Sequence, residues 1–274
     1  MLAGLLWLSS RSADGTIVLA AGSLLAALAA YEVGRMGKLA GRSLTLVLLP
    51  SVVVLYLFNK RLTTGPAPDL IEPSSSFATL VVALLITVAA WAALSLFKSS
   101  AANGSPPLGR SLALAAWIVF PLPALLHIWW NYQASGLVAL ILLCKLGDIA
   151  GYYVGNAIGK RHPFPNLSPG KTVAGCVASL VTGTLAGAGC VALDLLPSAP
   201  WGLGGGLVAG AVVNLAAQAG DLLESRVKRR AEVKDSGTWF GPSGGVLDLV
   251  DSLLLGVPAA LVAWPLLFDA PGIR

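Results

Sequence analysis

Residues 246–268 read VLDLVDSLLLGVPAALVAWPLLF, a run that is apolar except near its start. An α-helix needs roughly 20 apolar residues to cross the hydrocarbon core of a bilayer. Asp248, Asp251 and Ser252 interrupt the run in its first turns, where an ionised carboxylate is costly unless it is paired or bound to a metal. The stretch therefore predicts a membrane-spanning helix with functional groups at one end.

The rest of the chain has the same apolar character. Of its 274 residues, 56% are hydrophobic and 11% are charged, and the mean hydropathy is +0.79. Soluble domains carry about 25% charged residues, so this composition indicates lipid as the solvent. The apolar runs predict eight spans, each edge good to within a few residues: 16–33, 43–58, 77–97, 110–130, 136–158, 171–193, 202–224 and 246–268.

We therefore predict an all-α fold, a polytopic transmembrane helical bundle with about eight spans. Residues 2–9 are too short to decide between a ninth span and an interfacial segment. The chain is treated as one integral membrane domain. Within it, 1–135 form an N-terminal transmembrane region and 136–274 a C-terminal transmembrane catalytic region.

Positive charge is unevenly distributed along the chain, whose net charge is +5. Most Lys and Arg residues follow the first, third, fifth and seventh predicted spans, and the two richest loops are 159–171 and 225–245. The positive-inside rule puts these two loops in the cytoplasm and both termini outside. A miscounted span would change the assignment of the termini but would leave the two loops on one side.

The densest polar signal surrounds the second of these loops. Helical spacing predicts two stripes: Asp221, Glu224, Ser225 and Lys228 in one, and Asp248, Asp251 and Ser252 in the other. Carboxylates on two facing helix ends can hold divalent ions against a polyphosphate. The alternative is a loop that only fixes topology, with its acids paired to neighbouring side chains. Three acids set into apolar helix ends on the same side favour a site.

A second group of candidate residues lies upstream. Asp148 shares a helical face with Gly155 and Gly159, and the two glycines have the small-xxx-small spacing that lets helices approach closely. Packing alone explains the glycines, and Lys145 is placed to neutralise Asp148.

The segment that follows predicts an anion site at a helix start. Ser168 is a good N-cap, Pro169 suits the first helical position, and Lys171 and Thr172 follow in the first turn. Free N–H groups at a helix N-terminus bind phosphate readily. A P-loop is excluded, because it needs glycine where the chain has Pro165 and no strand precedes it.

These two segments together resemble the CDP-diacylglycerol synthase family (phosphatidate cytidylyltransferases). The family's C-terminal signature runs Ser-x-x-Lys-Arg, four residues, Lys-Asp, a Pro-x-His-Gly-Gly loop and Asp-Arg-x-Asp. The residues that fit it are Ser225, Lys228, Arg229, Lys234, Asp235, Gly244, Gly245, Asp248 and Asp251. Upstream, the fit includes Asp148, Gly155, Gly159, Lys160 and the family's Ser-Pro-x-Lys-Thr region at 168–172. The resemblance covers 138–255 well and the N-terminal half only by hydropathy.

Two departures from the signature matter for the chemistry. Ser243 stands where the family has the loop histidine, and Leu249 where it has the arginine between the last two acids. Neither serine nor leucine can replace a guanidinium as a bidentate phosphate partner. The departures put the usual substrate, or full activity, in doubt.

The resemblance implies transfer of a cytidylyl group from CTP to phosphatidate, giving CDP-diacylglycerol and pyrophosphate. For this reaction we expect Mg²⁺ at Asp221 and Asp248, with Asp251 in support, and leave open whether K⁺ joins it. Ser225 would donate to phosphate. The further substrate contacts it implies are Lys228, Arg229, Lys234, Asp235, Ser243, Ser168, Lys171, Thr172 and Asp148.

The expected partners are CTP, phosphatidate or another lipid phosphate, and membrane lipids; a homodimer is allowed and nucleic acid is not expected. The expected location is the cell (inner) membrane, with the active site facing the cytoplasm. Alternatives are a diverged enzyme for another lipid phosphate, a CTP-dependent lipid kinase and a catalytically silent lipid- or nucleotide-binding paralogue. A transporter is disfavoured, because its polar residues would gather near the bilayer midplane.

Overall fold

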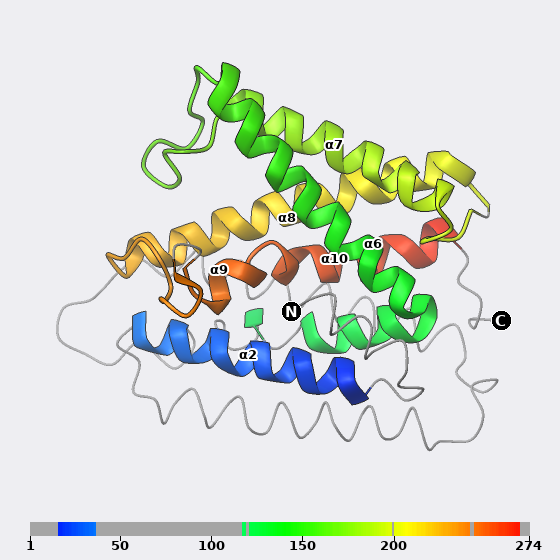
Figure 1. Ribbon diagram of the computed structural model, residues 1–274, viewed down its shortest axis with the longest axis horizontal. Helices are drawn as coiled ribbons and strands as arrows, with labels where there is room; N and C mark the ends of the chain where they lie inside the picture. Colours follow the sequence, from blue (N-terminus) through cyan, green and yellow to red (C-terminus); the bar gives the residue numbers. More distant parts are fainter. Residues whose placement is uncertain (1–15, 37–116, 119–120, 199, 242–243, 269–274) are drawn as a thin grey trace. The chain divides into compact units, whose positions relative to one another are not determined.

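The computed structural model describes residues 16–36, 117–118, 121–198, 200–241 and 244–268 (Figure 1). The described residues are helical and contain no strand, as the all-α prediction requires. The predicted spans 43–58 and 77–97, the first part of span 110–130 and residues 2–9 lie outside them. The count of eight spans therefore stays a prediction.

Six helices are described, numbered as in Figure 1: α2 (Thr16–Met36), α6 (Pro121–Ile158), α7 (Val173–Ala192), α8 (Gly202–Arg230), α9 (Val246–Val250) and α10 (Leu253–Phe268). Within the described part of the chain, four segments are long and apolar enough to cross a membrane: His127–Ile158, Val173–Ala192, Gly202–Arg230 and Val246–Phe268. These lengths and compositions are those of a helical membrane protein.

The chain divides into two compact units. The first unit comprises Met1–His127, Arg230–Val250 and Gly272–Arg274, and the second comprises Ile128–Arg229 and Asp251–Pro271. Among the described residues, α2 packs against α9 in the first unit. The second unit holds most of α6 together with α7, α8 and α10. The predicted division into 1–135 and 136–274 stays a prediction.

Glycines allow the helices of the second unit to touch along their backbones. A Cβ atom added to Gly175 of α7 would lie 2.6 Å from the Gly151 carbonyl oxygen of α6. One added to Gly187 of α7 would lie 2.0 Å from the Gly206 carbonyl oxygen of α8. Gly159 is equally crowded, because its added Cβ would lie 2.4 Å from Thr172 Oγ1. The packing interpretation of these small residues is confirmed.

A buried amide ties three of these helices together. Asn214 of α8 is fully buried, and its Nδ2 donates to the Leu143 carbonyl of α6 at 3.3 Å. Its Oδ1 accepts from Ser179 Oγ of α7 at 3.3 Å and from Gln218 Nε2 at 2.8 Å. Because a buried polar group is costly without partners, these bonds fix how α6, α7 and α8 are aligned.

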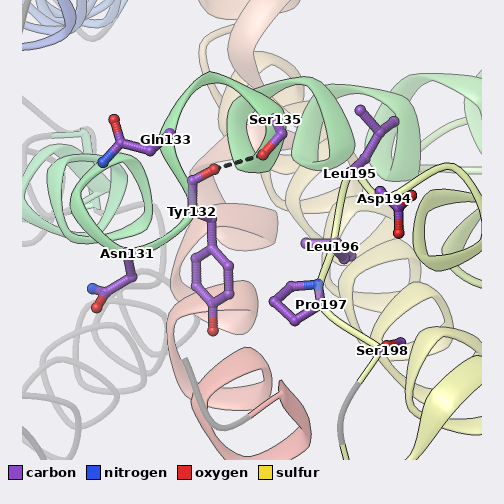
Figure 2. Close-up of a pocket in the computed structure, with 9 residues that line it drawn as sticks. All are labelled: Asn131, Tyr132, Gln133, Ser135, Asp194, Leu195, Leu196, Pro197 and Ser198. Atoms are coloured by element: carbon purple, nitrogen blue, oxygen red, sulfur yellow. Dashed lines mark hydrogen bonds between the residues drawn. The ribbon is translucent and has the colours of Figure 1, made fainter. Parts of the chain in front are cut away.

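The junction between the predicted spans 110–130 and 136–158 is a kink, not a loop. Gln133 has non-helical backbone angles (φ 53°, ψ −154°), so two helical stretches within α6 meet there at a kink. A cavity of about 450 Å³ opens beside the kink, lined by Asn131, Tyr132, Gln133, Ser135 and 194–198 (Figure 2). Ser135 Oγ donates to the Tyr132 carbonyl at 2.8 Å there.

The last predicted span is broken near its start. α9 ends at Val250, α10 begins at Leu253, and Asp251 and Ser252 form a turn between them. The Ser252 amide donates to Asp251 Oδ1 at 2.5 Å. Aspartate and serine side chains compete in this way with the bonds of a helix. The predicted span therefore holds over Val246–Phe268 but is interrupted by a turn at Asp251 and Ser252.

Candidate active site

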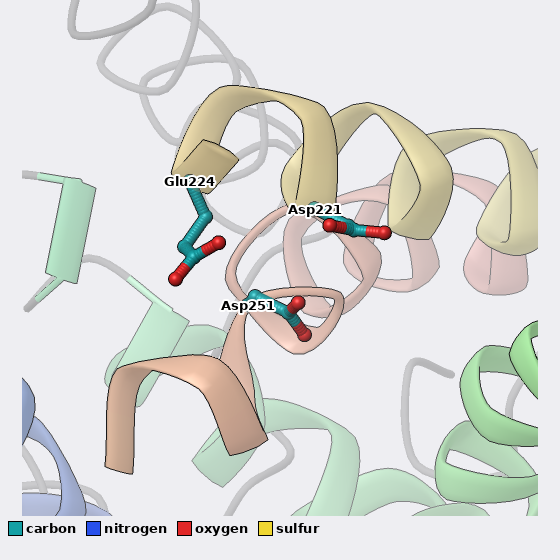
Figure 3. Close-up of side chains that lie close together, drawn as sticks. All are labelled: Asp221, Glu224 and Asp251. Carbon is teal, nitrogen blue, oxygen red and sulfur yellow. The ribbon is translucent and has the colours of Figure 1, made fainter. Parts of the chain in front are cut away.

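Three carboxylates of the second unit gather at one place. Asp221 and Glu224 come from the last turns of α8, and Asp251 comes from the turn after α9 (Figure 3). One oxygen from each lies within 4.8 Å of the other two. Gly220 permits this approach, because a Cβ added there would lie 2.6 Å from the Asp251 carbonyl oxygen. The arrangement is a candidate metal site made of oxygen ligands.

A lysine faces each of these acids. Lys171 Nζ lies 2.6 Å from Asp221 Oδ2, and Lys228 Nζ lies 2.7 Å from Glu224 Oε2. The second pair joins successive turns of α8, as the predicted helical stripe requires. Glu224 is fully buried while Asp221 is part-exposed, so the cluster reaches from the helix interior to the surface.

The third lysine comes from α6 and connects two acids. Lys145 Nζ lies 3.5 Å from Asp251 Oδ1 and 3.8 Å from Asp148 Oδ2. It also donates to Ser252 Oγ at 2.7 Å. The expected neutralisation of Asp148 by Lys145 is therefore confirmed, and the same ammonium group links α6 to the turn that carries Asp251.

We call this set the acid–lysine cluster: Asp148, Asp221, Glu224, Asp251, Lys145, Lys171 and Lys228. Four carboxylates face three ammonium groups, which leaves one formal negative charge when all seven are ionised. Such a cluster can exchange partners, because acids that now face ammonium groups can bind a cation while the lysines bind an anion.

Lys171 reaches the cluster from a β-turn, not from a helix. The Lys171 amide donates to the Ser168 carbonyl at 3.1 Å, with Pro169 in the position that proline favours in turns. α7 begins at Val173, and its N-cap is Thr172, whose side chain accepts from the Gly175 amide. The prediction of Ser168 as N-cap is wrong, because Ser-Pro-Gly-Lys forms the turn instead.

In the first unit, two further acids hold one loop. Asp248 Oδ2 accepts from the Gly245 amide at 2.6 Å, the Ser236 amide at 2.9 Å and the Ser236 hydroxyl at 2.8 Å. Glu32 of α2 accepts from the Val246 amide at 2.9 Å through Oε1. Its Oε2 accepts from the Leu247 amide at 2.9 Å and lies 2.7 Å from the Ser236 hydroxyl oxygen, so that this hydroxyl stands between the two acids. We call Glu32, Ser236, Asp248 and the backbone of 245–247 the Glu32 network.

The remaining predicted site residues have simpler surroundings. Ser225 is buried in α8. Arg229 is exposed, and its Nε donates to the Leu167 carbonyl at 3.3 Å. Lys234 and Asp235 are exposed in the loop before Ser236. Ser243 lies outside the described residues.

Sequence reasoning missed Glu32 and gave Lys145 only a local role. Glu32 is the one charged residue in the predicted span 16–33, which is the signal that marks a functional residue inside a membrane helix. The residues that resemble the family signature lie at 148–251, far from Glu32 in the chain, and nothing in them points to Glu32. Lys145 carries the same signal, because it is a charged residue within the predicted span 136–158.

The sequence of the chain is similar to those of known proteins. A sequence model described as "Cytidylyltransferase family" matches residues 1–267. The phosphatidate cytidylyltransferase of Mycobacterium leprae (strain TN) is 34% identical over 182 residues, which is 64% of this chain and 56% of that protein.

Two further relatives carry the same name. The phosphatidate cytidylyltransferase of Chlamydia muridarum is 36% identical over 138 residues, 48% of this chain and 41% of that protein. That of Aquifex aeolicus (strain VF5) is 27% identical over 217 residues, 68% of this chain and 81% of that protein. The chain spans about half the length of the mycobacterial and chlamydial relatives.

Proposed function

Because the chain belongs to the cytidylyltransferase family over residues 1–267, we propose that it transfers the cytidylyl group of CTP to phosphatidate, giving CDP-diacylglycerol and pyrophosphate in phospholipid synthesis. Its relatives named phosphatidate cytidylyltransferase support the choice of substrates. The observation that carries the proposal is the convergence of three carboxylates, each facing a lysine, beside the family's signature residues Lys228 and Asp251.

The proposed reaction needs no strong base. An oxygen of the phosphatidate phosphate forms a bond to the α-phosphorus of CTP. The bond between that phosphorus and the oxygen bridging to the β-phosphorus breaks, and pyrophosphate leaves with the electron pair. Since the attacking oxygen is already anionic, the protein's task is to align two anions and offset their repulsion.

The cluster geometry supports binding of Mg²⁺ by Asp221, with Glu224 and Asp251 as further ligands. Mg²⁺ holds oxygens at about 2.0–2.1 Å, so its ligands lie roughly 3–4 Å apart. The three oxygens here lie within 4.8 Å of one another, which a small side-chain rotation closes. A bound divalent cation would neutralise charge on the triphosphate and the departing pyrophosphate. A role of Asp248 as metal ligand, and of K⁺ beside Mg²⁺, remains part of the proposal.

Two of the three lysines are proposed to change partners when the nucleotide binds. Lys171 and Lys228 would leave Asp221 and Glu224 and turn to phosphate oxygens. Arg229 and Lys234 would add charge at the rim, and Asp235 and Ser243 further contacts with the substrates. Ser225 would donate to a phosphate oxygen. Ser168 and Thr172 flank Lys171, and with Asp148 they would complete the phosphate pocket.

The proposal places this site at the cytoplasmic surface of the cell membrane, where CTP is available. Phosphatidate would enter sideways from the bilayer. The lysine- and arginine-rich loops 159–171 and 225–245 support this orientation. A homodimer is compatible with the proposal but is not required by it.

A second candidate is the same chemistry on another lipid phosphate. It is favoured by Ser243 and Leu249, which stand where the family has a histidine and an arginine. Leu249 is half-buried in α9, so the side chain between the two acids offers no donor. The loss of one guanidinium would relax or change the recognition of the lipid headgroup.

The test is a turnover assay on the purified protein in mixed micelles. We expect pyrophosphate and a CDP-lipid in equal amounts, dependent on CTP, Mg²⁺ and phosphatidate, and abolished by EDTA. Turnover with a different lipid phosphate would favour the second candidate. Release of CDP in place of pyrophosphate would indicate a lipid kinase. Binding of CTP without any product would contradict catalysis.

A further inference from the structure

Glu32 is a buried acid whose donors come from a distant part of the chain, namely Ser236 and the first two residues of α9. It is 2% exposed in α2, and a carboxylate is tolerated in such a place only when donors surround it. Its donors are the amides of Val246 and Leu247 and the hydroxyl of Ser236. α2 is thus attached to the segment that continues into Asp248 and Asp251.

The loop is shaped to fit the two carboxylates. A Cβ added to Gly245 would lie 2.4 Å from both Glu32 oxygens, and one added to Gly237 would lie 2.6 Å from Glu32 Oε1. Gly244 has φ +82°, and a Cβ there would lie 2.3 Å from Asp248 Oδ2. The Gly-Gly pair of the signature therefore has a physical reason: one glycine makes room for Asp248, the other for Glu32.

Ser236 connects the two acids directly. Its hydroxyl oxygen lies 2.7 Å from Glu32 Oε2 and 2.8 Å from Asp248 Oδ2. A hydroxyl carries one proton, so it can donate to one of the two at a time. The Ser236 and Gly245 amides hold Asp248 Oδ2 from the backbone. The orientation of Asp248 therefore depends on the loop conformation that Glu32 maintains.

We propose that Glu32 is a positioning residue of the cytidylyltransferase site, which orients Asp248 by fixing Ser236, Gly245 and the start of α9. The proposal rests on the proposed function, and it makes α2 part of the catalytic machinery. Groups that orient ligands through hydrogen bonds change metal affinity or activity by about 10–100-fold when they are removed. We expect an effect of that size from Glu32→Ala.

The first measurement is hydrogen exchange in the absence of nucleotide, which needs no activity. Glu32→Ala removes the acceptor of the Val246 and Leu247 amides, so peptides covering 244–250 should exchange faster while peptides covering α7 do not change. Tyr31→Phe is the matched control, because Tyr31 is an exposed neighbour in the same helix. Unchanged exchange at 244–250 in Glu32→Ala would overturn the proposal.

The second measurement is the Mg²⁺ dependence of pyrophosphate release and of thermal stability. Glu32→Ala should raise the Mg²⁺ concentration for half-maximal rate and lower kcat by about 10–100-fold, with KM for CTP changed less. Glu32→Gln, which keeps the shape and one acceptor oxygen, should give an intermediate loss and serves if the alanine variant does not fold. A loss proportional to the unfolded fraction, with normal Mg²⁺ dependence, would mean a purely structural role.

Failure of the proposed function and failure of the positioning role of Glu32 give different results. If the wild type releases no pyrophosphate, the proposed function fails. Hydrogen exchange and the Mg²⁺-induced shift in Tm then still decide the role of Glu32. If the wild type turns over normally and Glu32→Ala does too, only the positioning role is wrong.

Discussion

The acid–lysine cluster and the Glu32 network both surround carboxylates with donors, but the donors differ in kind. In the cluster they are ammonium groups at the ends of flexible side chains, and Lys145 and Asp148 are about one-third exposed, at 31% and 35%. In the network they are mainly backbone amides that cannot move without the loop.

The two kinds of donor suit different roles. Ammonium groups can be displaced by a ligand, whereas backbone amides keep the protein in one conformation. The part-exposed pairs of the cluster, Lys145–Asp148 and Lys171–Asp221, contribute about 0–1 kcal/mol each, so an incoming ion can replace them at little cost. The Lys228–Glu224 pair is buried, so Glu224 needs another cation when Lys228 leaves it. Hydrogen bonds to a charged acceptor contribute about 1.5–3 kcal/mol each, and a buried carboxylate that loses them is left uncompensated. We infer that the cluster is built to exchange partners and the network to preserve one conformation.

The largest expected effect is on turnover, from Asp221→Asn in the cluster. The substitution removes a carboxylate charge where three acids converge, and we expect kcat/KM for CTP to fall by more than about 100-fold, beyond the usual effect of an indirect ligand contact. Tm should change little, because Asp221 is part-exposed and its pair with Lys171 contributes little stability. Pyrophosphate release and a melting curve in detergent measure both quantities.

The matched control is Asp194→Asn, which removes an equal charge from an exposed residue beside the cavity at the kink of α6. Asp194 has φ 55°, a conformation that asparagine accepts. Full turnover in Asp221→Asn would show that the cluster does not hold the catalytic ion.

Exchange of the lysines is tested by Lys171→Met. If Lys171 turns from Asp221 to a phosphate, its loss should raise KM for CTP and lower kcat/KM by about 10–100-fold, since a charge-assisted bond contributes about 1.5–3 kcal/mol. Steady-state kinetics at varied CTP measure the effect, with exposed Lys160→Met as control. A normal KM would mean that Lys171 only neutralises Asp221.

A substitution in the Glu32 network should have the opposite effect to one in the cluster, because it should lower the free energy of unfolding more than it lowers turnover. Ser236→Ala removes the hydroxyl between Glu32 and Asp248, and we expect the free energy of unfolding to fall by about 1.5–3 kcal/mol. Turnover should fall by less than about tenfold, because the backbone amides still hold Asp248. Exposed Thr238→Ala in the same loop is the control. Lost turnover at an unchanged Tm would instead place Ser236 in contact with substrate.

Much of the cluster follows from the sequence, because its residues lie on helices with regular spacing. Asp221, Glu224 and Lys228 fall on one stripe of α8, and the pairing of Lys228 with Glu224 follows from that spacing. The positions of α2, α7 and α8 follow from apolar runs that end at turn residues. Periodicity is sufficient wherever one helix carries all the groups concerned.

The network could not be predicted by the same reasoning. Glu32 and Val246 are far apart in the chain, and no periodic pattern links a single acid in one span to the amides of a distant loop. The break at Asp251 was missed for a local reason, since the apolar run continues across it while the aspartate side chain takes the Ser252 amide. The features that were not predicted therefore depend on two things: hydrogen bonds between segments that are distant in the chain, and side chains that compete with the helix for backbone amides.

The smallest expected effect on turnover comes from a change that loosens the second unit away from the cluster. Gly187→Ala would put a methyl group 2.0 Å from the Gly206 carbonyl oxygen, so α7 and α8 must separate at a cost of about 1–3 kcal/mol. Gly187 lies about 20 Å along α7 from its first residue, at 1.5 Å per residue. Turnover per folded molecule should therefore stay within about twofold, as for uncoupled sites.

Gly189→Ala is the matched control for Gly187→Ala, because no atom lies within 4 Å of a Cβ added there. It should leave Tm unchanged or slightly raised, since alanine favours the helix. If Gly187→Ala lowers turnover as strongly as Asp221→Asn, the cluster depends on the whole helix packing. Its chemistry would then not be local, and the contrast with the Glu32 network would no longer hold.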